Sequence, residues 1–244
     1  MKKLVFVLTF FIFLGGVRQS TGSFLTDTEK AENNILSVAT DWGITPTPTP
    51  TYFANYVVIS EVQITGGTGK TDNDFVEFYN PTSTPFDFKG HRLVKRIRGS
   101  STDITLKSWT STAIIPAYGF YLWANSSDGF ALSIGADAST SGYLTDNNSV
   151  ALRFGAENTG IIIDSLSWDS SPNSLKEGTE FSPNPGANQS IERKAYSTST
   201  PTSMFIGGAD EFKGNGFDSN NNATDFVLRS VSQPQNSSSS PEIP

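Results

Sequence analysis

The sequence predicts an all-β domain of antiparallel strands, built as a sandwich or a barrel. Two early stretches, residues 56–64 and 75–79, alternate their side chains between two faces with the period of two that a strand requires. Clusters of Asn, Asp, Ser, Gly and Pro then divide the chain into short segments, as turns between strands do. No stretch after residue 52 sustains a helical period, so short strands at regular intervals carry the fold.

The first strand places Val58, Val62 and Ile64 on one face and Glu61 and Gln63 on the other, so we expect one buried and one solvated side. The second strand stops at Asn80-Pro81, because proline has no N–H to donate to a neighbouring strand. The full set of expected strands is residues 56–64, 75–79, 92–97, 104–106, 119–124, 149–154, 161–168, 190–194 and 226–229.

The N-terminus has the pattern of an export signal over residues 1–22. Lys2 and Lys3 precede an apolar run at residues 4–14, and small residues at 20–22 suit cleavage before Ser23. The alternative is a retained anchor, but a spanning helix needs about 20 apolar residues. We therefore expect no membrane span after cleavage.

Residues 23–44 form a short segment that begins FLTDTEKAENN after Ser23. This piece resembles the start of the TasA/camelysin-type exported proteins, which a dedicated signal peptidase processes. The resemblance covers about twenty residues, and Ser37-Val38 replaces the usual Ala-Gly, so it implies processing rather than a fibre fold. The alternative is a short amphipathic helix capped by Thr26 or Asp27.

Residues 45–51, TPTPTPT, predict a stiff extended linker, because alternating proline and threonine cannot enter the interior of a sheet. The β domain is then expected over residues 52–232. Residues 233–244 are polar and rich in Ser and Pro, and they have too few apolar residues to pack, so we expect a disordered tail.

The domain carries a family resemblance in ordered pieces. ISEVQ, DFVEFYN, FDFKGHRL, IIPAYGFYLWAN and NQSIERK occur in this sequence in the order in which similar pieces occur in lamin tail domains. His91 stands where that family often has Trp. The resemblance, drawn from near residue 56 to near residue 232, implies an immunoglobulin-like antiparallel β-sandwich used for attachment or recognition, without family-wide catalytic residues.

Composition excludes several classes of site. The chain has no cysteine and one histidine, which removes disulfides, thiolate metal sites and multi-histidine metal sites. Its formal net charge is −7, which disfavours general binding to nucleic acid or to anionic membranes.

Two acidic groups are candidate calcium sites, since hard oxygen ligands suit Ca²⁺. Glu61, Asp72, Asp74 and Glu77 converge if the first two strands pair. The alternative is an exposed acidic rim with turn chemistry. Residues 218–225, DSNNNATD, have the composition of a calcium loop but lack its central Gly and distal Glu, which favours a polar turn.

A basic cluster and an aromatic group are candidate ligand sites. Arg92, Arg96 and Arg98 alternate along one strand beside Lys89, so the patch could hold an anionic polymer, and the alternative is a solvated face or a charged edge. Tyr121 and Trp123 could stack on a sugar, although strand aromatics usually belong to the core.

The sequence therefore predicts an exported, non-catalytic β-sandwich module, secreted or on the cell surface. Its expected partners are cell-wall or extracellular polysaccharide or protein, with no cofactor except possible calcium. One alternative is a matrix subunit that self-assembles when residues 24–42 add a strand to a neighbouring copy. The other is a hydrolase, either a nuclease or a glycosidase, which would need His91 or a carboxylate pair.

Overall fold

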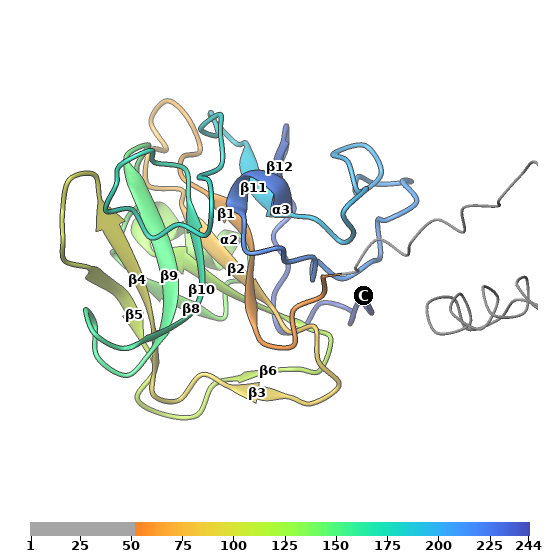
Figure 1. Ribbon diagram of the computed structural model, residues 1–244, viewed down its shortest axis with the longest axis horizontal. Helices are drawn as coiled ribbons and strands as arrows, with labels where there is room; N and C mark the ends of the chain where they lie inside the picture. Colours follow the sequence, from red (N-terminus) through yellow and green to blue (C-terminus); the bar gives the residue numbers. More distant parts are fainter. Residues whose placement is uncertain (1–51) are drawn as a thin grey trace, which may run out of the picture. The chain divides into compact units, whose positions relative to one another are not determined.

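The computed structural model describes residues 52–244, which form a two-layer β-sandwich. The predictions for residues 1–22, 23–44 and 45–51 concern residues outside this range. A six-stranded sheet has the order β12-β11-β1-β2-β7-β8, and a four-stranded sheet has the order β10-β9-β4-β5 (Figure 1). The expectation of an all-β antiparallel sandwich is confirmed, with β7 and β8 as a parallel pair within it.

Each expected strand is present. The long ones are β1 (Val58–Gln63), β2 (Phe75–Tyr79), β4 (His91–Ile97), β5 (Ile104–Ser108), β7 (Phe120–Asn125), β9 (Asn148–Phe154), β10 (Ile161–Ser167), β11 (Ser190–Arg193) and β12 (Phe226–Arg229). Three short strands were not predicted, namely β3 (Phe86–Asp87), β6 (Ile114–Ile115) and β8 (Ala138–Thr140). Two or three residues are too few to show a period of two, so the sequence gives no sign of them.

Helices play a small part in the described domain. Single turns are formed by Ser127–Gly129, α2 (Phe130–Ser133) and α3 (Asn222–Asp225). None of the helices within residues 52–244 has the length and apolar character needed to cross a membrane.

The main core lies between the two sheets and is rich in aromatic rings. Phe88 stacks on Trp109 with ring centroids 4.6 Å apart, and the Trp109 indole N–H donates to the Tyr121 hydroxyl at 3.1 Å. Trp123 is fully buried, and its indole N–H donates to Thr140 Oγ1 at 3.1 Å. These rings fill the space that the inward-facing residues of both sheets enclose.

The outer face of the six-stranded sheet is also buried, which the sequence did not predict. Glu61 and Gln63 are only 2% and 3% exposed, whereas alternation placed them on a solvated side. Two segments lie on this side of the sheet, residues 195–217 and the last residues of the chain (Figure 1). The outer face is therefore buried because segments distant in sequence cover it.

The expectation that residues 233–244 are disordered is wrong, because these residues hydrogen-bond to the sheet. The Gln233 N–H donates to Glu61 Oε1 at 3.2 Å, and the Gln235 N–H donates to Glu77 Oε2. Glu242 continues the contact by donating its N–H to the Tyr118 carbonyl at 2.8 Å. The low content of apolar residues predicted disorder, because apolar residues are what usually hold a segment in place. Here hydrogen bonds from polar groups hold the segment instead.

A buried arginine ties the two sheets together. Arg193 of β11 is fully buried, and its guanidinium contacts both Asp164 carboxylate oxygens at 2.9 Å on β10. It also donates to the Ile59 carbonyl at 2.8 Å and lies over the Phe226 ring. A register shift between Ile162 and Asp164 accompanies the inward position of Asp164.

We expect Arg193→Ala to lower the free energy of unfolding by about 3–5 kcal/mol, because it leaves the Asp164 carboxylate buried without its partner. Lys176→Ala is the control, since Lys176 also pairs with a carboxylate, that of Glu180, but both side chains are partly exposed, at 27% and 23%, and its loss should cost about 1 kcal/mol or less. Urea unfolding of residues 23–244 measures both. Equal losses for the two variants would contradict the structural role of Arg193.

Candidate functional site

Three glutamates form one row across the outer face of the six-stranded sheet. Glu61 of β1 lies opposite Glu77 of β2 on one side and opposite Glu192 of β11 on the other. Like charges directly opposite each other destabilise a sheet, so this row needs compensating donors. We call Glu77, Glu61 and Glu192 the glutamate row.

Each member of the row has its own hydrogen-bond donors. Ser190 Oγ donates to Glu61, and Ser60 Oγ donates to Glu77 Oε1 at 2.7 Å. A register shift between Ile59 and Glu61 lies next to Ser60 in β1.

Glu192 forms an ion pair with Arg229 of β12 and accepts from Asn215 Nδ2 at 3.2 Å. The other two glutamates of the row have no ion-pair partner among residues 52–244. Within the described part of the chain, the row therefore has one cationic partner for three carboxyl groups.

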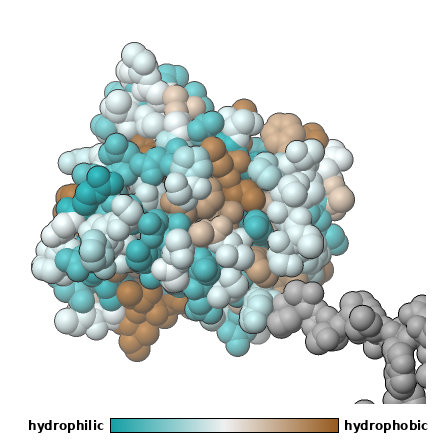
Figure 2. All heavy atoms as spheres, turned by 45° about the horizontal axis from the view of Figure 1, so that its top comes forward, coloured by the Kyte–Doolittle hydropathy of each residue, from teal (hydrophilic) through white to brown (hydrophobic). Residues whose placement is uncertain are grey.

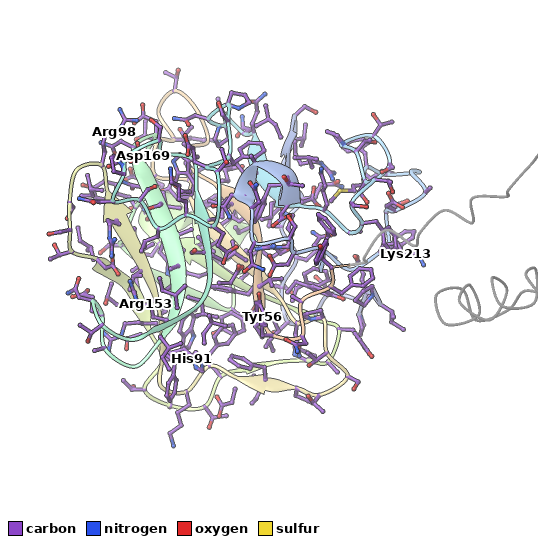
Figure 3. The ribbon with its side chains drawn as sticks, in the orientation of Figure 1. Tyr56, His91, Arg98, Arg153, Asp169 and Lys213 are labelled. Carbon is purple, nitrogen blue, oxygen red and sulfur yellow. The ribbon has the colours of Figure 1, made fainter. Side chains whose placement is uncertain are left out.

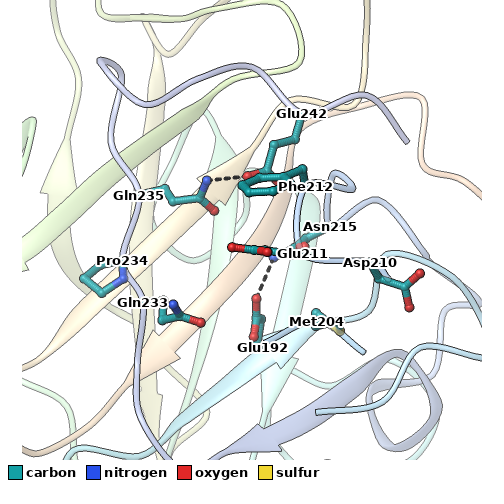
Figure 4. Close-up of a pocket in the computed structure, with 10 residues that line it drawn as sticks. All are labelled: Glu192, Met204, Asp210, Glu211, Phe212, Asn215, Gln233, Pro234, Gln235 and Glu242. Carbon is teal, nitrogen blue, oxygen red and sulfur yellow. Dashed lines mark hydrogen bonds between the residues drawn. The ribbon is translucent and has the colours of Figure 1, made fainter. Parts of the chain in front are cut away.

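A cavity of about 330 Å³ opens beside Glu192 at the end of the row (Figure 4). Four carboxylate side chains line it, those of Glu192, Asp210, Glu211 and Glu242. Within residues 52–244 no basic side chain lines it. We call this space the acidic cavity.

Neutral groups complete the wall of the acidic cavity. Asn215, Gln233 and Gln235 contribute amide groups, and Gln235 Nε2 donates to Glu242 Oε1 at 2.8 Å (Figure 4). The Phe212 ring is 73% exposed and stands at the wall with buried Met204. The cavity thus combines oxygen acceptors with an aromatic ring and a thioether.

Burial shifts the titration of these acids. It raises the pKa of Glu61 to about 7 and that of Glu192 to about 8, against an ordinary value of 4.5. Burial likewise raises the pKa of Glu242 to about 7, and burial together with the neighbouring Glu61 raises the pKa of Glu77. A positive charge in the cavity would favour the ionised forms, so cation binding and proton release are linked here.

The predicted calcium set is not formed as a group. The structure brings Glu61 and Glu77 together, but Asp72 is exposed in the loop before β2. Asp74 is fully buried and accepts from the Leu144 N–H at 2.6 Å on the core side. Its alternation with Glu77 puts it on the opposite face of the sheet, so the four carboxylates do not converge.

The loop at residues 218–225 is folded by its own hydrogen bonds, as expected of a polar turn. Asp225 accepts from the backbone N–H groups of Ser219 and Asn221, and Asp218 accepts from the Tyr56 hydroxyl. Carboxylate oxygens of Glu177, Asp218 and Asp225 lie within 4.8 Å of one another, the one such trio in the described domain. The sequence missed Glu177, which lies more than forty residues earlier.

The basic residues of β4 are bound within the domain. Arg96 pairs with Asp103 at 2.6 Å, and Arg92 donates to the Gly155 carbonyl at 2.7 Å. Arg98 pairs with Asp169 at 2.6 Å, at the end of β4 opposite to His91 (Figure 3). Lys89 is exposed in the turn before β4. Because the three guanidinium groups have partners, they do not form the free anion-binding face that alternation suggested.

The expectation of an aromatic sugar platform at Tyr121 and Trp123 is wrong. Both side chains face the core between the sheets, with 6% and 0% exposure. Exposed apolar residues occur elsewhere, in separate patches on a mostly hydrophilic surface (Figure 2). Phe212 is one of them, and no sequence pattern singled it out, since it lies in the irregular 195–217 segment.

We expect the domain to lose stability between pH 5 and pH 8. A glutamate whose folded pKa lies above its unfolded value stabilises the fold fully below about pH 4.5, and this contribution is lost as pH rises through the folded pKa. For Glu61 the upper bound is about 3 kcal/mol, at about 1.4 kcal/mol for each unit of pKa. Burial lowers the pKa of His91, so its contribution to stability rises with pH, opposite to that of the glutamates. It is one group against several glutamates.

Thermal melts at the two pH values test this. We expect a fall in Tm of roughly 5–10 °C from pH 5 to pH 8. Glu61→Gln should reduce that fall, because its amide oxygen still accepts hydrogen bonds without ionising. Asp128→Asn, at an exposed aspartate, should leave it unchanged. A Tm that rises with pH would contradict the assignment.

Part of the sandwich that carries this site matches a known protein family. Residues 50–170 match the family model described as Lamin Tail Domain. This region spans β1 to β10, whereas β11, β12 and the glutamate and cavity residues from 192 onward lie beyond it. A comparison with curated proteins found no match. The ordered sequence pieces, the two-layer antiparallel fold and this match agree, and the chain carries an immunoglobulin-like lamin tail domain.

Proposed function

We propose that the protein is an exported, non-catalytic recognition module that holds a cationic group of a cell-surface or extracellular partner in the acidic cavity. Export is supported by the charged and apolar pattern of residues 1–22. A binding role is supported by the immunoglobulin-like domain type. The partner is a cell-wall or extracellular polysaccharide or protein that carries ammonium or guanidinium groups.

The charge of the cavity wall carries this proposal. Four acidic residues line a space of about 330 Å³ that no basic residue of the described domain lines. Inside a partly buried site the attraction between opposite charges is stronger than in water, so a cation gains more here than at an open surface. The net charge of −7 also favours the approach of cationic partners.

The neutral part of the wall suits an organic cation better than a bare metal ion. The volume exceeds what one ion requires, and the exposed Phe212 ring can face an ammonium or guanidinium group. Met204 offers an apolar contact for an aliphatic stem. Asn215, Gln233 and Gln235 supply amide oxygens as further acceptors.

The position of His91 supports a non-catalytic role. Its ring is 8% exposed and packs beside Phe86 and Phe154, each with ring centroids 4.9 Å away. Burial lowers the pKa of His91, and the imidazole lies at the start of β4, outside the cavity lining. It is therefore suited to packing rather than to proton transfer at the cavity.

A hydrolase remains the second candidate, favoured by one observation. Glu192 and Glu242 line one cavity with raised pKa values, as a glycosidase general acid requires. Incubation with chromogenic glycosides separates the candidates, and we expect no turnover above the buffer rate. Turnover abolished by Glu192→Gln would replace the binding proposal.

We expect spermidine, a small probe with several ammonium groups, to bind residues 23–244 and to bind more weakly as salt rises. Glu211→Gln with Glu242→Gln should weaken binding by about tenfold, because two cavity charges are lost. Asp72→Asn with Asp128→Asn changes the net charge equally outside the cavity and should have little effect. Calorimetric titration measures all three, and equal weakening by both pairs would contradict a cavity site.

A further inference from the structure

Residues 233–244, which we call the strap, lie on the sheet like a bound peptide. Gln233 and Gln235 donate their backbone N–H groups to Glu61 and Glu77, which are carboxylates of neighbouring strands. Donors two residues apart point to one side of an extended chain. Pro234 between them fixes its own φ and has no N–H to satisfy. The carboxylates of Glu61 and Glu77 thus accept alternate N–H groups of one extended segment.

Polar bonds hold the rest of the strap. Asn236 Nδ2 donates to the Gly135 carbonyl at 2.9 Å, and the Ser237 N–H donates to Asp137 Oδ2 at 3.0 Å. The Ile243 side chain is 63% exposed, so it supplies little apolar anchoring. Each such bond replaces a bond to water and contributes about 0.5–1.5 kcal/mol net, so a segment that makes the same bonds can compete with the strap.

The strap also forms part of the acidic cavity. Gln233, Pro234, Gln235 and Glu242 line that cavity, opposite Glu192 and Asn215 (Figure 4). A ligand that enters the cavity therefore meets strap side chains on one wall. If the strap moves away, the cavity becomes continuous with the face that carries Glu61 and Glu77.

We propose that the partner of the acidic cavity is an extended polypeptide segment, which displaces the strap and binds the glutamate row in its place. This inference rests on the proposed function and names the class of partner. Glu61 and Glu77 accept alternate backbone N–H groups of the incoming segment, and the cavity carboxylates that lie outside the strap, those of Glu192, Asp210 and Glu211, accept a Lys or Arg side chain. The strap is the intramolecular occupant that the partner must replace.

The observations favour a polypeptide over a polysaccharide. Sugar hydroxyls can also donate to carboxylates, but the glutamate row is already satisfied at the repeat of a polypeptide backbone. A basic side chain on such a segment would meet Asp210 and Glu211, which line the cavity and have no ion-pair partner within residues 52–244. The glycan alternative is an outcome of the test below.

The test weakens the strap in residues 23–244 by one substitution. Gln235→Pro removes the N–H that donates to Glu77, and Ser240→Pro is the matched control, because Ser240 is exposed and donates no hydrogen bond to the sheet. The probe is a dye-labelled synthetic peptide of residues 230–244, followed by fluorescence anisotropy. Circular dichroism confirms that each variant is folded.

We expect the labelled peptide to bind the Gln235→Pro chain about tenfold more tightly than wild type, because the fraction of open sites rises. The Ser240→Pro chain should match wild type, and a peptide carrying Gln235→Pro should bind none of them. A peptide with Gln235→Lys should bind more tightly than the parent peptide, since its ammonium would take the place of the Gln235 amide that donates to a cavity carboxylate.

Two results would overturn the inference. One is that folded Gln235→Pro binds the peptide no better than wild type. The other is that Gln235→Pro gains affinity for chitosan oligosaccharides and none for the peptide. Spermidine binding to the wild-type chain is measured in parallel, so a failure of the polypeptide inference is distinguished from a failure of the cavity itself.

Discussion

Three glutamates side by side on one sheet face, of which Glu61 and Glu77 are buried and Glu192 is partly buried, are the constraint that shapes the functional half of this molecule. Glu77, Glu61 and Glu192 face one another across paired strands, beneath segments that keep water away. Buried carboxylates persist only where donors surround them. Ser60, Ser190 and Arg229 supply donors from the sheet, and Gln233 and Gln235 supply them from the strap.

The two faces of the six-stranded sheet thus have different roles. The inner face carries Trp123 and Phe78 into the core between the sheets, and Arg193 links β11 to β10 there. The outer face carries acids and is covered by residues 195–217 and by the strap. A rigid inner layer fixes the strand register, and that register sets the spacing of the glutamate row and the position of the acidic cavity.

Sequence patterns predicted the sandwich because strand alternation is a local property. The run at 56–64 identified β1, and alternation correctly placed Glu61 and Glu77 on the face opposite to Val62 and Val76. Alternation says nothing about what covers a face, so the burial of Glu61 was missed. Asp74 was grouped with Glu77 because the two are close in sequence, although their separation by three positions puts them on opposite faces of the sheet.

The rest of the site depends on contacts between distant segments. Glu192 and Glu242 join the acidic cavity from positions far along the chain, and the irregular 195–217 segment supplies Phe212. The composition of residues 233–244 indicated disorder, because a scale of apolar content gives no weight to backbone N–H groups held by buried acids. Arginines on β4 suggested a basic patch, but their partners, such as Asp103, could only be found in three dimensions.

The glutamate row meets the acidic cavity at Glu192, which belongs to both. Protons on these acids and a cationic group in the cavity compete for the same negative charge. Burial, which acts on all of these acids, sets their pKa values and therefore the outcome of that competition. The raised pKa values distinguish this face from an ordinary acidic surface. Buried carboxyl groups also need hydrogen-bond donors, and an extended chain covers them with its backbone N–H groups.

The most direct measurement is a titration of the glutamate carboxyl carbons by nuclear magnetic resonance, with Glu61, Glu77 and Glu192 assigned by Gln substitution. Our account predicts that Glu61 titrates near pH 7 and Glu192 near pH 8, each far above the ordinary value of 4.5. Titration of all three near pH 4.5 would show them to be solvated, and the buried row on which this account rests would not exist.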